Sequence, residues 1–246
     1  MGQGVNSRLS KSWTPDELKS RVRGVLQARY VDRHPFMTAL YDGKLTKKQI
    51  QAWIINRFYL QNNIASKDAA IVSNCPIPEV RRIWLSRSLR REGMGDSVGD
   101  IDGWLEFAEA AGLRKEKVMG AKCLPGVRFA VDGLVNFARR STWLEGIATS
   151  LYEVLAREEL VKRTNALKKH YTWISPGGLK FFHSRLGRIE IDSGVVVDLV
   201  STYATEKRSQ TEAIQAALQM SDVIWCIHDA IYMNYVAMDS PLSASI

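Results

Sequence analysis

The chain has 246 residues, of which 46% are hydrophobic and 24% charged, proportions typical of one globular domain with a substantial core. Its formal charge of +8 is compatible with nucleic acid, anionic lipid or an acidic small molecule as partner. The basic residues are spread through helical patterns and no DNA- or RNA-reading motif is present, so we expect no nucleic-acid partner. No apolar run approaches the roughly 20 residues that cross a bilayer, and the first ten residues lack the apolar stretch of a signal peptide. We therefore expect a cytoplasmic protein without a membrane partner.

The metal-binding residue types are sparse and badly spaced for a metal site. Cys75, Cys123 and Cys226 are isolated, which favours a reducing compartment. A di-iron bundle needs Glu-x-x-His pairs, and no histidine of this chain has a glutamate three residues before it. We therefore predict no metal, and we interpret His228 as a hydrogen-bonded core histidine and His34, which precedes a proline, as a turn residue.

Helix signals begin after a polar segment. Residues 1–13 contain glycine and serine and are predicted to be a flexible N-terminus. Thr14, Pro15 and Glu17 then form a helix start, because threonine can cap, proline suits the first helical position and the glutamate completes a capping box. This helix is predicted to reach about Tyr30, and Asp42-Gly43 predicts a turn.

Residues 46–74 form the predicted central helix, with Ile50, Trp53 and Phe58 on a core-facing stripe. Arg57 and Gln61 fall on the same stripe. Because a buried, unpaired charge is costly, a guanidinium group there needs a partner. Either a carboxylate meets it inside the protein, or the helix lines a pocket for an anionic ligand.

The next predicted helix runs from Pro78 to Gly93 and carries Arg87 and Arg91 four residues apart. The loop that follows has a GxGxxxG spacing, but it comes after a helix and not after a strand, so we reject a dinucleotide site. Further helices are predicted over 100–111, 115–122, 127–140, 142–169, 180–186, 193–206 and 211–236, and a frayed tail over 239–246. With no alternating strand pattern and no internal repeat, the sequence predicts an all-α, single-domain compact helical bundle over 14–238.

Candidate catalytic motifs are few. Glu158 and Glu159 could pair as carboxylates, but their surroundings resemble a solvated helix face, and no GxSxG motif marks a serine hydrolase. The inward arginines remain, and arginine binds carboxylates through two parallel hydrogen bonds. Internal ion pairs are the alternative interpretation, for example Arg57 with Asp68 or Arg87 with Asp132.

Several strings of the sequence match one family. These are AWIINRFYLQ with KDAAI and NCP, RHPF with DGKL, and LPGVRFAVD followed by NFARR. They resemble the pyrroloquinoline-quinone synthase (PqqC) family, over about residues 18–237. The resemblance implies the haem-oxygenase/TenA/PqqC fold, a homodimer, and a cofactor-free, metal-free oxidase. Such an oxidase closes a ring and oxidises an aromatic polycarboxylate, uses O2 as co-substrate and releases H2O2.

The resemblance also assigns site residues. It implies that Tyr30, Lys67 and Arg91 are the catalytic candidates. The implied substrate-binding residues are Arg57, Gln61, Arg87, Arg163 and Arg185. Arg57 and Gln61 are thus indicated twice, by the resemblance and by their place on the inward stripe.

The chain departs from the family where the family transfers protons. Val31, Leu134, Leu160, Phe181 and Met220 stand where family members have histidine, tyrosine or lysine, and Arg91-Glu92-Gly93 replaces His-Asp-Gly. Arginine stays protonated and cannot act as a general base. Three hypotheses follow: a PqqC-like oxidase, a catalytically altered relative that binds a quinone or another aromatic acid or acts on a different substrate, and an interaction protein whose arginines are ion-paired.

Overall fold

A computed structural model describes residues 12–94 and 98–237. The predicted tail, most of the predicted flexible N-terminus and the centre of the glycine-containing loop lie outside the described residues. Trp13, the last residue of the predicted flexible segment, is held in place. Its backbone N–H donates to Gln210 Oε1 at 2.7 Å, and Gln210 Nε2 donates to its carbonyl at 2.8 Å.

The described residues contain helices and no β-strand, which confirms the predicted all-α class. The α-helices are α1 (Pro15–Gln27), α2 (Pro35–Tyr41), α3 (Lys47–Asn74), α4 (Pro78–Glu92), α5 (Asp100–Ala110), α6 (Lys115–Met119), α7 (Pro125–Arg140), α8 (Trp143–Ala148), α9 (Ala156–His170), α10 (Lys180–Tyr203) and α11 (Lys207–Tyr232). Three 3₁₀ segments are η1 (Val31–Arg33), η2 (Thr149–Leu155) and η3 (Pro176–Leu179), and a π-helical turn, η4 (Met233–Ala237), follows α11.

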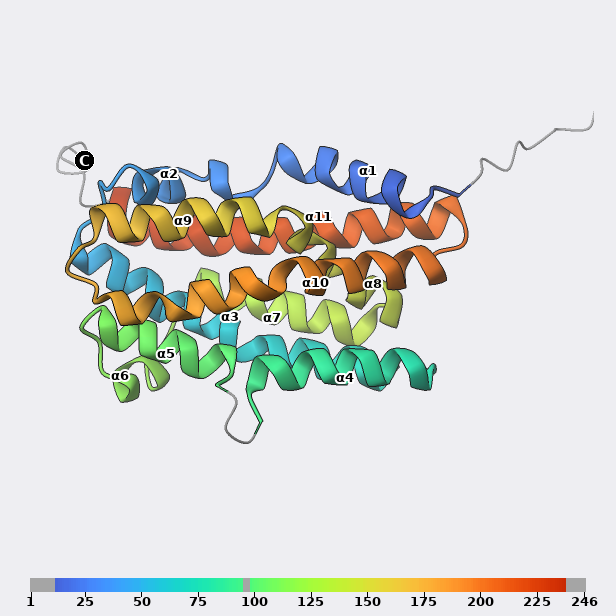
Figure 1. The fold of residues 1–246 in the computed structure, drawn as a ribbon, viewed down its shortest axis with the longest axis horizontal. Coiled ribbons are helices and arrows are strands. Elements are labelled where there is room, and N and C mark those ends of the chain that lie inside the picture. The colour runs from blue at the N-terminus through green and yellow to red at the C-terminus, as the bar shows by residue number, and fades with distance from the viewer. Residues whose placement is uncertain (1–11, 95–97, 238–246) are drawn as a thin grey trace, which may run out of the picture.

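The long helices lie side by side along the longest axis of the molecule (Figure 1). Helix α11 packs against α7 and η2, and α3 packs against α7. Helices α1, α9 and α11 form one side of the bundle in this view, and α4, α5 and α6 form the opposite side. A layer of central helices thus lies between two outer groups, which is how helices with one apolar face bury it.

The predicted helix starts are confirmed. Thr14 caps α1 and Thr142 caps α8, each with a reciprocal capping box to the glutamate three residues later. Gly93 ends α4 with φ +84°, a backbone conformation that glycine adopts readily because it has no Cβ. These local signals act within one helical turn, so the sequence alone specifies them.

One predicted helix, over 142–169, is broken in the structure. Seven residues of it form the 3₁₀ segment η2, between α8 and α9. Thr149 Oγ1 donates to the carbonyl of Gly146 at 2.7 Å, and side chains on several sides of this segment are buried. A segment that is buried all round can wind more tightly than an α-helix, because packing and not propensity sets its geometry.

Two predicted helices, over 180–186 and 193–206, form one helix in the structure. Helix α10 continues through Gly187 and the polar residues between the two predicted helices. Arg188 pairs with Asp100 of α5, and Asp192 pairs with Arg90 of α4. The polar residues therefore mark contacts with neighbouring helices and not a loop. Other helix ends differ from prediction by a few residues.

An aromatic cluster fixes one end of the core. Trp104 of α5 lies with its ring centroid 5.4 Å from Trp53 of α3 and 5.5 Å from Phe107, and Phe107 lies 4.9 Å from Phe182 of α10. The rings meet edge to face, the arrangement that aromatic quadrupoles favour. This cluster holds α3 against α5 and α10, which carry much of the site described below.

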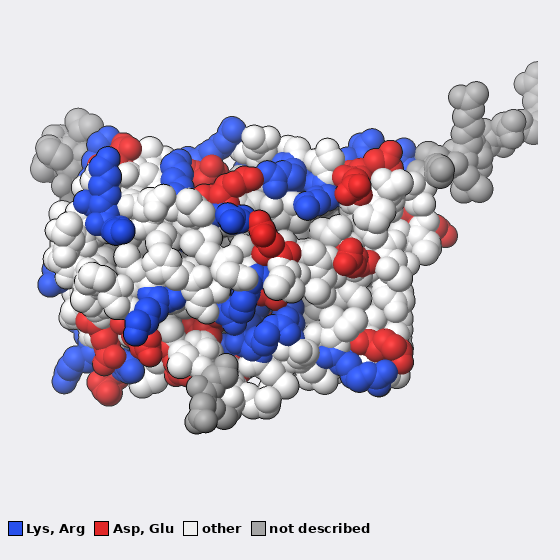
Figure 2. Space-filling model, viewed as in Figure 1, with Lys and Arg blue, Asp and Glu red and all other residues white. Residues whose placement is uncertain are grey.

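The surface charges are mixed. On the face drawn in Figure 2, basic side chains lie interspersed with acidic ones. Exposed ion pairs such as Arg157–Glu190 and Arg23–Glu158 account for part of this pattern. Among the described residues, no helix is both long and apolar enough to span a membrane.

Candidate functional site

A cavity of about 110 Å³ lies inside the bundle. Its walls come from α3, η2, α9, α10 and α11, with single residues from η1, α4 and α5. The charged and polar lining residues are Tyr30, Arg57, Gln61, Lys67, Arg91, Thr149, Ser150, Tyr152, Glu153, Glu159, Arg163, Arg185 and His228. The structure thus brings together seven of the eight predicted site residues around one space.

Cations outnumber carboxylates in this lining. Five lysine and arginine side chains face two glutamates. Four of the five cations have an ion-pair partner: Lys67 with Asp68, Arg91 with Glu153, Arg163 with Glu159, and Arg185 with Asp100. Two of these partners, Asp68 and Asp100, stand behind the wall and do not line the cavity.

Arg57 is the exception. It makes no ion pair and no hydrogen bond to any described residue, although its Nε and Nη1 atoms are buried. Burial and the neighbouring charge of Arg163 lower the pKa of Arg57 to about 10. The predicted partner Asp68 is instead held by Lys67 Nζ at 3.0 Å and by Trp84 Nε1 at 3.2 Å, so the Arg57–Asp68 alternative was wrong. An unpaired guanidinium group in a cavity wall is available to an anionic ligand.

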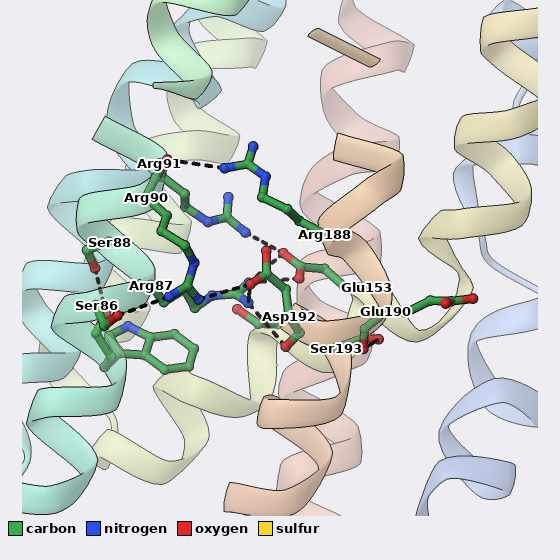
Figure 3. A network of polar contacts seen from close by, with 12 residues as sticks. Ser86, Arg87, Ser88, Arg90, Arg91, Glu153, Arg188, Glu190, Asp192 and Ser193 are labelled. Atoms are coloured by element: carbon green, nitrogen blue, oxygen red, sulfur yellow. Dashed lines mark hydrogen bonds and ion pairs between the residues drawn. The ribbon is translucent and has the colours of Figure 1, made fainter. Parts of the chain in front are cut away.

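Arg87 is the predicted site residue that does not line the cavity. It is buried among carboxylates, in the network of Figure 3, where arginines of α4 face Glu153 of η2 and Asp192 of α10. The predicted partner Asp132 instead accepts a hydrogen bond from Tyr59. Arg87 therefore supports the wall from behind, and its predicted direct contact with a ligand has no support in this structure.

Glu153 is shared between two arginines. Its carboxylate accepts hydrogen bonds from Arg87 Nη2 and from Arg91 Nη2. Burial alone would raise the pKa of Glu153, but the two guanidinium groups outweigh it and hold that pKa well below its ordinary value. Glu153 is therefore an anion at every working pH, and it occupies much of the hydrogen-bonding capacity of Arg91.

Lys67 and Tyr30, two predicted catalytic residues, are both buried in the cavity wall. Lys67 Nζ donates to Ser150 Oγ at 3.2 Å, and burial lowers the pKa of this lysine. The ring of Tyr30 stacks on Tyr152 with centroids 4.4 Å apart. Burial and the Tyr152 neighbour raise the pKa of Tyr30 well above its ordinary value, so its hydroxyl group keeps its proton at neutral pH and can donate a hydrogen bond.

Sequence reasoning missed six polar lining residues, and two of them, Glu159 and His228, were misread. Glu159 does not lie on a solvated face: it is buried, pairs with Arg163 at 3.2 Å and accepts from the hydroxyl of Tyr41. His228 is buried but not fully hydrogen-bonded, because its Nε2 has no partner among the described residues. Tyr152 and Glu153 were hidden in the unrecognised 3₁₀ segment. The available signal was a glutamate inside the apolar run 151–155, because burying a carboxylate is costly unless a cation pairs with it.

His34 is also more than a turn residue. It caps α2, where its Nδ1 accepts the backbone N–H of Phe36 at 3.0 Å, and its Nε2 lies 3.0 Å from Asp229 Oδ1. Both ring nitrogens therefore have partners. This histidine is structural and lies outside the cavity lining.

Four of the apolar replacements stand in the cavity wall, namely Val31, Leu160, Phe181 and Met220. Leu134 is buried but outside the lining. The cavity thus combines an arginine-rich part with apolar patches that suit a flat aromatic body. Among the described residues, no group of three or more His, Cys, Asp or Glu side chains is arranged to hold a metal ion.

Comparison with known proteins places this arrangement in a family. Residues 20–226 match the TENA/THI-4/PQQC family. A pyrroloquinoline-quinone synthase from Cronobacter sakazakii is 40% identical over 229 residues, which cover 93% of this chain and 91% of that protein. A pyrroloquinoline-quinone synthase from Pseudomonas aeruginosa is 44% identical over 210 residues, which cover 84% and 83%.

Solved structures share the fold at low identity. A domain from Shewanella denitrificans described as having a heme oxygenase-like fold superposes with a TM-score of 0.77 at 14% identity, over 92% of this chain and 94% of that one. A TenA homologue from P. horikoshii superposes with a TM-score of 0.68 at 11% identity, over 88% of this chain and 98% of that one. The predicted haem-oxygenase-like fold is confirmed, and the chain belongs to the TENA/THI-4/PQQC family, within its pyrroloquinoline-quinone synthase group.

Proposed function

We propose that this protein is an oxidase of pyrroloquinoline quinone biosynthesis that binds an aromatic polycarboxylate in the cavity and oxidises it with O2. The relatives' name supplies the pathway. O2 as co-substrate and the absence of a bound cofactor come from the resemblance of the sequence to the PqqC family. The same resemblance suggests a homodimer, and the isolated cysteines suggest a cytoplasmic location.

The unpaired guanidinium group of Arg57 carries the proposal. A buried charge without a partner is unfavourable, so a protein that keeps one has a ligand to pair with it. Tyr30, Gln61 and Arg163 line the same cavity as Arg57 and supply further donors. A ligand carboxylate at this point would gain charge-assisted hydrogen bonds that none of the described protein groups makes.

The remaining cations would act on other parts of the same ligand. Lys67 and Arg185 are held from behind by Asp68 and Asp100, which fixes their orientation without filling the cavity. The hydroxyl group of Tyr30 would hold a proton near the aromatic ring of the ligand. The apolar residues Leu160, Phe181 and Met220 would contact the aromatic body and exclude water. Electrons leaving the ring would pass to O2, with release of H2O2.

The test is a rapid mix of the purified protein with the tricyclic polycarboxylate precursor and O2. Quinone absorbance and peroxide release are followed together. Conversion with stoichiometric H2O2 is the expected result. No spectral shift of either the precursor or pyrroloquinoline quinone at concentrations up to the millimolar range would overturn the assignment.

The second candidate is a catalytically altered protein that binds the quinone or another aromatic acid. The apolar side chains of Val31, Leu160, Phe181 and Met220 in the wall favour it, because none of them can transfer a proton. A ligand that binds, shifts in absorbance and remains unconverted would select this candidate. The two readouts of the same experiment thus separate the functions.

A further inference from the structure

His228 is a buried histidine with one unused nitrogen. It lies on α11, is 1% exposed and contributes to the cavity lining. Its Nδ1 lies 2.8 Å from the carbonyl oxygen of Ile224, one turn earlier in the helix. Its Nε2 is buried and has no hydrogen-bond partner among the described residues.

The Ile224 contact fixes the tautomer. A carbonyl oxygen can only accept, so Nδ1 must carry the proton, and Nε2 of the neutral ring then presents a lone pair. Burial and the positive charge of Arg57 lower the pKa of His228 well below its ordinary value, which keeps the ring neutral. The other charged or titratable groups that act on it are Arg163 of α9 and His34, whose ring centroid lies 5.6 Å away.

Two unsatisfied groups therefore stand in one cavity wall. Arg57 offers N–H donors and a positive charge, and His228 offers a lone pair. The two groups bind complementary partners: Arg57 suits a carboxylate, and His228 suits an N–H or O–H group. Leaving either group buried and unpaired is costly, so a ligand that supplies both partners gains most.

We propose that Arg57 and His228 together recognise an aromatic ring on which a carboxylate and an N–H or O–H group are neighbours, and that this N–H or O–H group donates a hydrogen bond to His228 Nε2. No proton is transferred in this contact, so the imidazole stays neutral. This inference rests on the proposed function and names the ligand group that the anion site takes.

Two matched probes test the inference. Pyrrole-2-carboxylate carries an N–H beside its carboxylate, and furan-2-carboxylate has a ring oxygen there, which would face the His228 lone pair. We expect the wild-type protein to bind the pyrrole acid at least about fivefold more tightly, the factor that one net hydrogen bond supplies. In His228→Leu this preference should vanish, while Arg57→Met should weaken both probes.

Nitrogen NMR of labelled protein supplies a readout that does not depend on turnover. The free protein should show His228 as the neutral Nδ1–H tautomer, and the pyrrole acid should shift its Nε2 signal. His183→Leu, which removes an exposed histidine of α10, is the control and should change neither result. Since His228→Leu leaves the Ile224 carbonyl within the helical hydrogen-bond ladder, it should remain folded, which a thermal melt would verify.

The outcomes separate this inference from the proposed function. Equal preference in wild type and His228→Leu, failure of both probes to bind, or a proton on Nε2 of the free protein would each overturn it. A His228-dependent preference without oxidation of the tricyclic precursor would keep the inference and remove the oxidase. Oxidation of the precursor by His228→Leu with the kcat and KM of the wild type would remove the inference and keep the oxidase.

Discussion

Arg87 Nη2 lies 2.7 Å from both carboxylate oxygens of Glu153, although the two residues are 66 positions apart in the chain. Arg87 is 1% exposed. The pair joins α4 to the 3₁₀ segment that forms one wall of the cavity. A buried pair of this kind is a structural tie whose loss leaves a charge without its partner.

We expect Arg87→Ala to lower the free energy of unfolding by about 3 kcal/mol, the lower end of the cost of breaking a buried pair, because Arg91 still contacts Glu153. Urea denaturation would measure it. Arg90→Ala is the matched control from the same helix. Arg90 is about half exposed, so its loss should cost at most about 1 kcal/mol. Equal effects of the two variants would contradict the structural role of Arg87.

Arg57→Met should separate stability from binding. It removes a buried guanidinium that no described residue pairs with, so we expect the free energy of unfolding to rise by about 1 kcal/mol. Affinity for pyrroloquinoline quinone should fall roughly 10- to 150-fold, which corresponds to the loss of about 1.5–3 kcal/mol from hydrogen bonds to a charged group.

Arg163→Met is the control for this prediction. It removes an arginine of the same cavity whose partner Glu159 would remain buried, so stability should fall and not rise. Chemical denaturation and an absorbance titration would be run on both variants. Unchanged quinone affinity in Arg57→Met would refute the anion site.

Arg91→His should fold and increase turnover. Glu153 keeps its two contacts with Arg87, so this carboxylate does not lose its partner. Histidine can exchange a proton near neutral pH, whereas arginine cannot, and one positioned acid or base is worth roughly 10²- to 10⁴-fold in rate. The measurement is kcat against pH, where a new ionisation should appear. Loss of soluble protein would instead show that Arg91 is needed for folding.

The stability of the protein should fall as the pH is lowered from about 7.5 to 5.5. Burial lowers the pKa of His228 and of His34 in the folded state. The unfolded chain, with histidine pKa values near 6.5, then binds more protons than the folded protein, so unfolding is favoured below about pH 6.5 and stability is full above it. Denaturation midpoints across this range would show the slope, and His228→Leu should flatten part of it. A slope unchanged by that variant would mean that His228 is not buried in neutral form.

The helix pattern of the sequence predicted much of the site. The stripe through Trp53 and Phe58 placed Arg57 and Gln61 on the inward face of α3, and both line the cavity. That inference needed only the helical period of 3.6 residues. Arg87 has the same kind of pattern on α4 and yet faces Glu153, because a helical pattern carries no information on which segment will lie opposite.

Glu159 and His228 are residues whose surroundings the sequence pattern could not predict. Glu159 sits in a polar run that reads as a solvated face, and its burial depends on α2 packing over α9, where Tyr41 reaches it. His228 sits in an apolar run, and whether its second nitrogen is satisfied depends on the space beside α11. Neither fact has a local signal, since both depend on side chains from distant parts of the chain.

The sequence by itself determined the all-α class, the capped starts of α1 and α8, and the cationic stripe of α3, because caps and amphipathic periods act within a few residues. Tertiary structure alone decided which cations are paired. Ion pairs form only between groups within about 4 Å, and α4, η2 and α10 meet only after folding. Thus Arg87 gained Glu153, Arg185 gained Asp100, and Arg57, which lines the cavity, was left with no carboxylate partner within residues 12–94 and 98–237.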